Sequence, residues 1–206
     1  VKTLLTHPAA VFLADVKINP GGPPEIEAGA VVHVGSVEEA AALETKLVEY
    51  QTKMLGEAVK AVEIAGDTCY RIQPPEPGAP SITWGIRHSY LIVGVGPGSV
   101  EGIMERAAGD MPEWLREVRG QLAVPRRSTL TYLNLAAIRD KAMPFAPPQA
   151  AQIIDALGLQ NVTSLVSVTG LDEEGFVSRA LLGIEGEPSG IFALVPEEPL
   201  TPEDLE

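Results

Sequence analysis

Short apolar segments follow one another between residues 62 and 95, and the turns that join them in pairs hold very few residues. Parallel neighbours in a sheet need a crossover of about a dozen residues or more, whereas antiparallel neighbours can be joined by a tight turn. The sequence therefore predicts two antiparallel hairpins and argues against a doubly wound parallel sheet. The expected strands are residues 62–65, 69–73, 81–87 and 90–95, with turns at Gly66–Asp67 and His88–Ser89.

The last of these strands has two distinct faces, because successive side chains of a strand point in opposite directions. One face carries Tyr90, Ile92 and Gly94. The alternation predicts that the other face, formed by Leu91, Val93 and Val95, is turned toward the core.

Two segments that follow expected strands carry helix signals. Residues 37–55 come after Ser36 and Glu39, which match the S-x-x-E capping box at the start of a helix. A second helix is expected to begin at Ser99, after a glycine- and proline-containing turn.

A third, short helix is expected near Pro112, with Asp110 as its cap. Its apolar stripe has helical spacing and consists of Trp114, Val118 and Leu122. A broken helical region is expected over residues 136–157, where several prolines interrupt the pattern.

Further strands are expected along the chain from runs of β-branched and aromatic residues. They are residues 11–16, 30–34, 129–135, a long hairpin at 161–171 and 176–186 with its turn at Asp172–Gly175, and a last strand at 191–195. Together these elements predict an α+β fold, mainly antiparallel sheet, with helices packed on one face.

The domain organisation expected for residues 1–206 is a single α+β domain. A possible pseudo-repeat divides it into about 1–125 and 126–200, and residues 196–206 are linker-like. The repeat rests mainly on one phrase, a strand and a glycine turn followed by S-V-E, at Ser36–Glu38 and again at Ser99–Glu101. Internal β–α duplication explains the phrase; convergence of short turns on capping residues explains it equally well.

Composition excludes several classes of function. The net charge of -13 disfavours nucleic-acid binding, since an acidic surface repels phosphate backbones. The longest apolar runs fall far short of the roughly 20 residues of a membrane span, so no span is expected in this chain. The single cysteine rules out an internal disulfide and a cysteine-based zinc site.

The glycine-rich turn Gly94–Ser99 is the one candidate ligand site, because a strand leads into it and a helix follows. Backbone N–H groups at such a helix start attract anions, and the candidate ligand-binding residues are Gly96, Gly98 and Ser99. The turn lacks the third glycine of a dinucleotide loop and is preceded by a hairpin strand, so a structural turn is the simpler interpretation. No cofactor and no metal site are expected.

The polar residues do not form a recognisable catalytic pattern. The three histidines are scattered, and Cys69 lacks a glycine elbow or a helix start that would lower its thiol pKa. The chain is therefore more simply a non-catalytic module than an enzyme. The alternative is an enzyme whose site is assembled from distant residues such as Asp15, His33 or Cys69.

Several phrases that cover most of the chain carry a resemblance to a known family. They are HPAAVFLADV, AVVHVGSVEEAAAL, TWGIRHSYLIVGVG, STLTYLNLAAI and NVTSLVSVTGLDEEGFVSR. With these phrases the chain resembles a bacterial domain-of-unknown-function family, notably of planctomycete type, found in exported or membrane-anchored proteins. The phrases are structural and the family has no agreed activity, so the resemblance implies no functional residues.

The resemblance implies an extracytoplasmic location, periplasmic or at the cell surface, and a longer parent protein. The function expected from residues and resemblance together is a binding or scaffold module of a larger exported bacterial protein. Its partners are unknown and include, as one possibility, other domains of that parent. Small-anion or ligand binding at the Gly94–Ser99 turn stays open as a further alternative.

Overall fold

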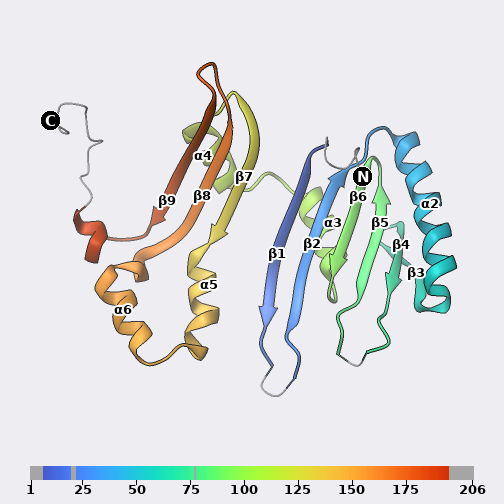
Figure 1. Ribbon diagram of the computed structural model, residues 1–206, viewed down its shortest axis with the longest axis horizontal. Helices are drawn as coiled ribbons and strands as arrows, with labels where there is room; N and C mark the ends of the chain where they lie inside the picture. Colours follow the sequence, from blue (N-terminus) through green and yellow to red (C-terminus); the bar gives the residue numbers. More distant parts are fainter. Residues whose placement is uncertain (1–6, 20–21, 77, 195–206) are drawn as a thin grey trace. The chain divides into compact units, whose positions relative to one another are not determined.

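The computed structural model describes residues 7–19, 22–76 and 78–194, and it confirms the expected α+β fold with mainly antiparallel sheets. Two sheets are present in the described chain, one of six strands and one of three (Figure 1). The chain divides into two compact units, Val1–Asp110 and Met111–Glu206. Each unit contains one sheet and its own helices.

The first unit is built on a sheet of order β1-β2-β6-β5-β4-β3, with every neighbouring pair antiparallel. Its strands are β1 (Ala9–Lys17), β2 (Glu25–His33), β3 (Val59–Ile64), β4 (Asp67–Ile72), β5 (Ile82–Arg87) and β6 (Tyr90–Val95). The two predicted hairpins are thus confirmed as β3–β4 and β5–β6.

The two hairpin turns show how local backbone geometry selects residues. The first turn lies one residue earlier than expected, because Asp67 already pairs with Ile64 and the tip is Ala65–Gly66, both at positive φ. The second turn is at His88–Ser89 as expected, and His88 adopts a φ of 55°. Non-glycine residues uncommonly take this left-handed conformation.

Helices α2 (Val37–Leu55) and α3 (Ser99–Ala108) pack on opposite faces of this sheet, and not on one face as expected. From α2, the Gln51 side chain accepts a 2.8 Å hydrogen bond from Trp84 on β5. From α3, Val100 packs against Cys69, which pairs with Gly85, the residue after Trp84. Successive strand residues point to opposite faces, so the two helices cover different sides.

The core side of β6 is the reverse of the expected one. Ile92 is buried against α3, whereas Leu91 and Val93 on the other side are only partly buried. The reason is close approach: a Cβ on Gly94 would lie 2.8 Å from side-chain atoms of Ser99 and Val100. Helix α3 can therefore pack only on the side of β6 that carries glycine, and the all-aliphatic side of β6 lies on the opposite face of the sheet.

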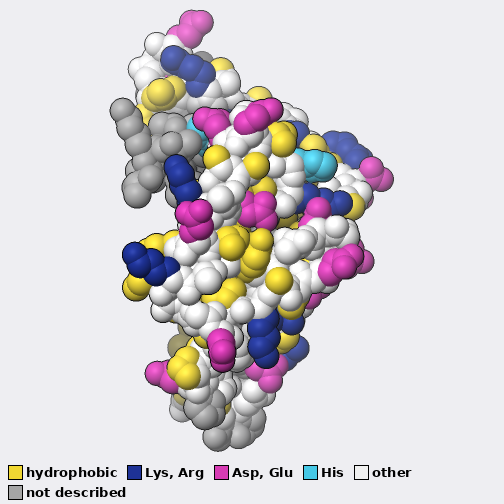
Figure 2. Space-filling view, turned by 90° about the vertical axis from the view of Figure 1, so that its right-hand side faces the viewer, with side chains coloured by type: hydrophobic (Ala, Val, Ile, Leu, Met, Phe, Trp, Pro, Cys, Tyr) yellow, Lys and Arg dark blue, Asp and Glu magenta, His cyan; other side chains and the backbone are white. Residues whose placement is uncertain are grey.

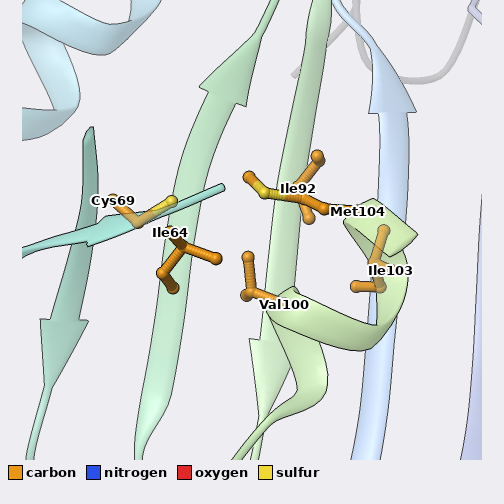
Figure 3. Packing of buried hydrophobic residues seen from close by; sticks show 6 residues of the cluster. All are labelled: Ile64, Cys69, Ile92, Val100, Ile103 and Met104. Carbon is orange, nitrogen blue, oxygen red and sulfur yellow. The ribbon is translucent and has the colours of Figure 1, made fainter. Parts of the chain in front are cut away.

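The core of the first unit lies between α3 and the sheet. Six buried side chains point into this space, from β3, β4, β6 and α3 (Figure 3). They are Ile64, Cys69, Ile92, Val100, Ile103 and Met104. Gly29 on β2 extends the contact, since a Cβ there would meet Ile103 at 2.8 Å.

The second unit is a three-stranded antiparallel sheet of order β7-β8-β9 with three helices. Its elements are α4 (Glu113–Gln121), β7 (Arg126–Asn134), α5 (Leu135–Ala142), α6 (Gln149–Leu157), β8 (Val162–Leu171) and β9 (Phe176–Ile184). The predicted apolar stripe of α4 is confirmed: Val118 and Leu122 are buried against Val166 and Val168 of β8, with Trp114 beside them.

Two local expectations in the second unit are wrong. Asp110 does not cap α4, because Pro112 occupies the N-cap position and makes no side-chain capping bond. Residues 190–194 form a 3-10 helix, η4 (Gly190–Leu194), where a last strand was expected. A run of five apolar residues does not distinguish a strand from a short helical turn without a pairing partner.

The repeated phrase has two different local structures. Ser36 is the N-cap of α2 and forms the predicted capping box with Glu39 through both of its bonds, 3.2 Å and 2.8 Å long. Ser99 is already inside α3, whose N-cap is Gly98, and its hydroxyl donates to the carbonyls of Val95 and Gly96. The same three letters thus begin two helices in different ways, and duplication stays a prediction.

The boundary between the two compact units falls at Asp110, whereas the expected pseudo-repeat divides near residue 125. Helix α4 explains the position of the boundary, because its buried face packs on the second sheet. The linker-like interpretation of residues 196–206 concerns a segment outside the described residues.

Candidate functional site

The Gly94–Ser99 turn is built mainly by internal contacts. The Gly96 amide donates to the Ser81 carbonyl at 2.8 Å. The Ser99 hydroxyl donates to the carbonyls of Val95 and Gly96 within the turn itself. Gly98 takes a left-handed φ of 76° and has open space around it. An anion at this turn would therefore meet backbone N–H groups without a side-chain hydroxyl.

A carboxylate stands next to this turn. Glu101 stands in the first turn of α3 and pairs with Arg71, with 3.3 Å between the carboxylate and the guanidinium. A carboxylate at a helix start occupies the place that favours an incoming anion. Anion binding at Gly96, Gly98 and Ser99 stays a prediction.

Cys69 is fully buried in the core beneath α3. Burial first, and then the negative charges of Asp67 and Glu101, raise the pKa of its thiol. A raised pKa keeps the sulfur protonated, and the thiolate is the nucleophilic form. Cys69 is therefore a packing residue in this arrangement, as the sequence predicts.

The residues named for a distant-residue enzyme are not brought together. Asp15 of β1 lies opposite Glu27 of β2 in the strand register, and His33 follows Glu27 by six residues along β2. At the rise of a strand, Asp15 and His33 are therefore about 20 Å apart. Cys69 lies three strand spacings from β2, about 14 Å. Hydrogen-bonded proton transfer needs contact or one bridging water, so these three residues form no relay.

An uncovered apolar surface is the most distinctive feature of the first unit. Two rows of aliphatic side chains cross strands β1, β2 and β6 in register, on the sheet face opposite α3. We call this surface the open face; its rows are Val11–Ala30–Val93 and Leu13–Ala28–Val95. In the sequence, the open face is signalled by the all-aliphatic side of β6, which the alternation pattern alone assigns to the core.

Exposure on the open face rises toward the sheet edge. Val11 is 83% exposed and Leu13 is 64% exposed. Helix α2 covers the same face over β5 and β3, where Trp84 is buried. Because β1 is the outer strand, the open face continues directly into an edge whose main chain has no partner strand among the described residues.

A cavity of about 420 Å³ lies on the other side of the first sheet, at the C-terminal end of α3. Its lining is mostly apolar and includes Ile92 of β6 and Met104, Ala107 and Ala108 of α3. Arg87 also lines it and is paired with Asp67 at 3.4 Å. The lining could hold a small apolar group with a polar end.

On the face seen in Figure 2, acidic and basic side chains are interspersed, with hydrophobic side chains between them. Among the described residues no three histidine, cysteine, aspartate or glutamate side chains are grouped so that they could hold a metal ion. No helix in the described chain has the length and apolar character needed to cross a membrane.

Comparisons of the chain with protein-family models, with curated proteins and with solved structures found no match.

Proposed function

We propose that the chain is a non-catalytic binding or scaffold module of a larger exported bacterial protein. The open face carries this proposal. Its occupant, we propose, is an extended segment of a partner chain that adds to β1 as a further strand. Such strand addition uses main-chain hydrogen bonds for affinity and alternate side chains for specificity.

The edge of β1 favours an added strand. Exposed sheet edges are usually protected by charges, prolines or bulges. Residues 9–13 of β1, with the sequence AAVFL, carry no charge and no proline. The protective features come later in the strand, as a bulge between Leu13 and Asp15 and the charge of Lys17. The first half of β1 is thus available for pairing.

The open face determines the chemistry of the partner. A strand added beside β1 places every second side chain over the same face as Val11 and Leu13. Burying these two side chains would contribute about 3 kcal/mol at the usual value per apolar side chain. The partner segment should therefore be extended and should carry aliphatic residues at alternate positions.

The proposal is tested with a labelled eleven-residue peptide that alternates valine with threonine, and a control peptide of the same composition with two added prolines. We expect the full chain to bind the first peptide and not the second. Val11→Lys and Leu13→Lys should each weaken binding at least about tenfold, because each places a charge on the buried side of the new strand. Fluorescence anisotropy measures both affinities.

Val37→Lys is the matched control, since Val37 is an exposed valine at the start of α2 and belongs to neither row of the open face. It should bind the peptide as the unchanged chain does. Equal binding by Val11→Lys would remove the proposal. A dimer that Leu13→Lys dissociates, seen by sedimentation, would instead assign the open face to a second copy of the chain.

The extracytoplasmic part of the proposal rests on the sequence resemblance. Fractionation of cells that produce the full-length parent protein would test it, and recovery in the cytoplasm would contradict it without affecting the strand-addition experiment.

A further inference from the structure

A cavity in the second unit has a lining whose charge is opposite to that of the chain as a whole. The cavity measures about 460 Å³ and is open to solvent. Its lining includes Arg119 near the end of α4, Arg127 near the start of β7 and Arg179 in β9. Three arginines from three elements thus line one cavity in a chain of net charge -13. This arginine pocket belongs to the second unit and is separate from the open face.

The three arginines are not neutralised by the described acidic residues. The ion pairs of the described chain involve other cations, namely Lys17, Arg71, Arg87 and Arg139. Asp172 is the one carboxylate that lines the arginine pocket in the described chain. Its Oδ1 accepts hydrogen bonds from the amides of Glu174 and Gly175, at 2.9 Å and 3.0 Å, and so stabilises its own turn.

The position of Arg179 is unusual for the strand pattern. Arg179 pairs with Val168, which is fully buried beneath α4, and shares its face of β9 with the partly buried Val177. Alternation alone would place an aliphatic residue there. Arg179 is exposed instead, and it lines the arginine pocket together with Arg119 of the covering helix.

We propose that the arginine pocket binds an oxyanion group of the phosphate or sulfate type, carried by a small molecule. Guanidinium groups present planar, paired donors that match such oxygens. Like charges that share one pocket repel one another, and a divalent oxyanion relieves that repulsion while forming charge-assisted hydrogen bonds. A carboxylate offers fewer oxygens and one charge, so it should bind more weakly.

The test uses inorganic phosphate, sulfate and acetate with the full chain, at constant ionic strength, followed by NMR of the arginine Nε–H groups and by calorimetry. We expect phosphate or sulfate to shift the signals of Arg119, Arg127 and Arg179, and acetate to bind at least about fivefold more weakly. Comparison of phosphate with sulfate separates a phosphoryl from a sulfuryl ligand.

Arg119→Gln, Arg127→Gln and Arg179→Gln should each weaken binding of the preferred anion about fivefold or more. Arg116→Gln is the matched control, because Arg116 lies on the same helix as Arg119, does not line the pocket and donates to the Met111 carbonyl. It should change affinity by less than about twofold.

Thermal unfolding in anion-free buffer checks that the variants fold. There the three pocket variants should unfold at the same or a higher temperature than the unchanged chain, since each removes like-charge repulsion. The proposal is overturned if neither phosphate nor sulfate binds at millimolar concentration, if acetate binds as tightly, or if the pocket variants bind as the Arg116→Gln control does.

Discussion

Single glycines decide which side of the first sheet faces α3. Gly29, Gly85 and Gly94 lie on neighbouring strands, and a Cβ at any of them would come within 3.0 Å of another group. Glycine at such positions marks close approach of another backbone or side chain. The sequence rule that the more aliphatic side of a strand is buried fails at β6 because this steric requirement outweighs it.

Gly94→Ala should destabilise the chain by about 1–3 kcal/mol, because the added methyl group overpacks a tight site. Gly120→Ala is the matched control, because nothing lies within 4 Å of its added Cβ and it stands inside helix α4. That control should stabilise by up to about 1 kcal/mol. Urea unfolding of both variants gives the two free energies, and an unchanged or increased stability of Gly94→Ala would refute the close-approach explanation.

For helices and strands, local sequence signals predict which elements are present better than they predict how those elements pack. The capping box of Ser36 and Glu39, the stripe of α4 and the hairpins all depend on residues close in sequence, and they were predictable for that reason. The side of the sheet on which α2 and α3 pack depends on contacts such as Gln51 with Trp84, which are distant in sequence. The open face and the arginine pocket could not be predicted, because each is assembled from several strands or helices.

The capping box also gives a test at this scale. Ser36→Ala removes the hydroxyl that accepts from the Glu39 amide and should cost about 1 kcal/mol of unfolding free energy. Thr45→Ala, in the exposed middle of the same helix, removes only a bond to the Ala41 carbonyl and should change stability by less than about 0.5 kcal/mol. Equal effects of the two variants in urea unfolding would show that the cap does not stabilise α2.

At the scale of the whole molecule, the chain consists of two compact units that offer different chemistry. The first unit presents an aliphatic face that continues into an unpartnered strand edge, and the second unit presents a pocket of three arginines. Neither feature resembles a catalytic arrangement, and the residues named for a relay lie far apart. The two roles proposed for these features, strand addition and oxyanion binding, are both binding roles.

Strand addition at β1 would give the β1 amides new hydrogen-bond partners, and amide hydrogen exchange measures this residue by residue. With the alternating valine–threonine peptide bound, amides within β1 (Ala9–Lys17) should exchange more slowly, because their outward N–H groups gain main-chain partners. The amides of β3, the opposite edge strand, should be unchanged. Slower exchange at β3, or unchanged exchange at β1 under saturating peptide, would contradict strand addition at β1.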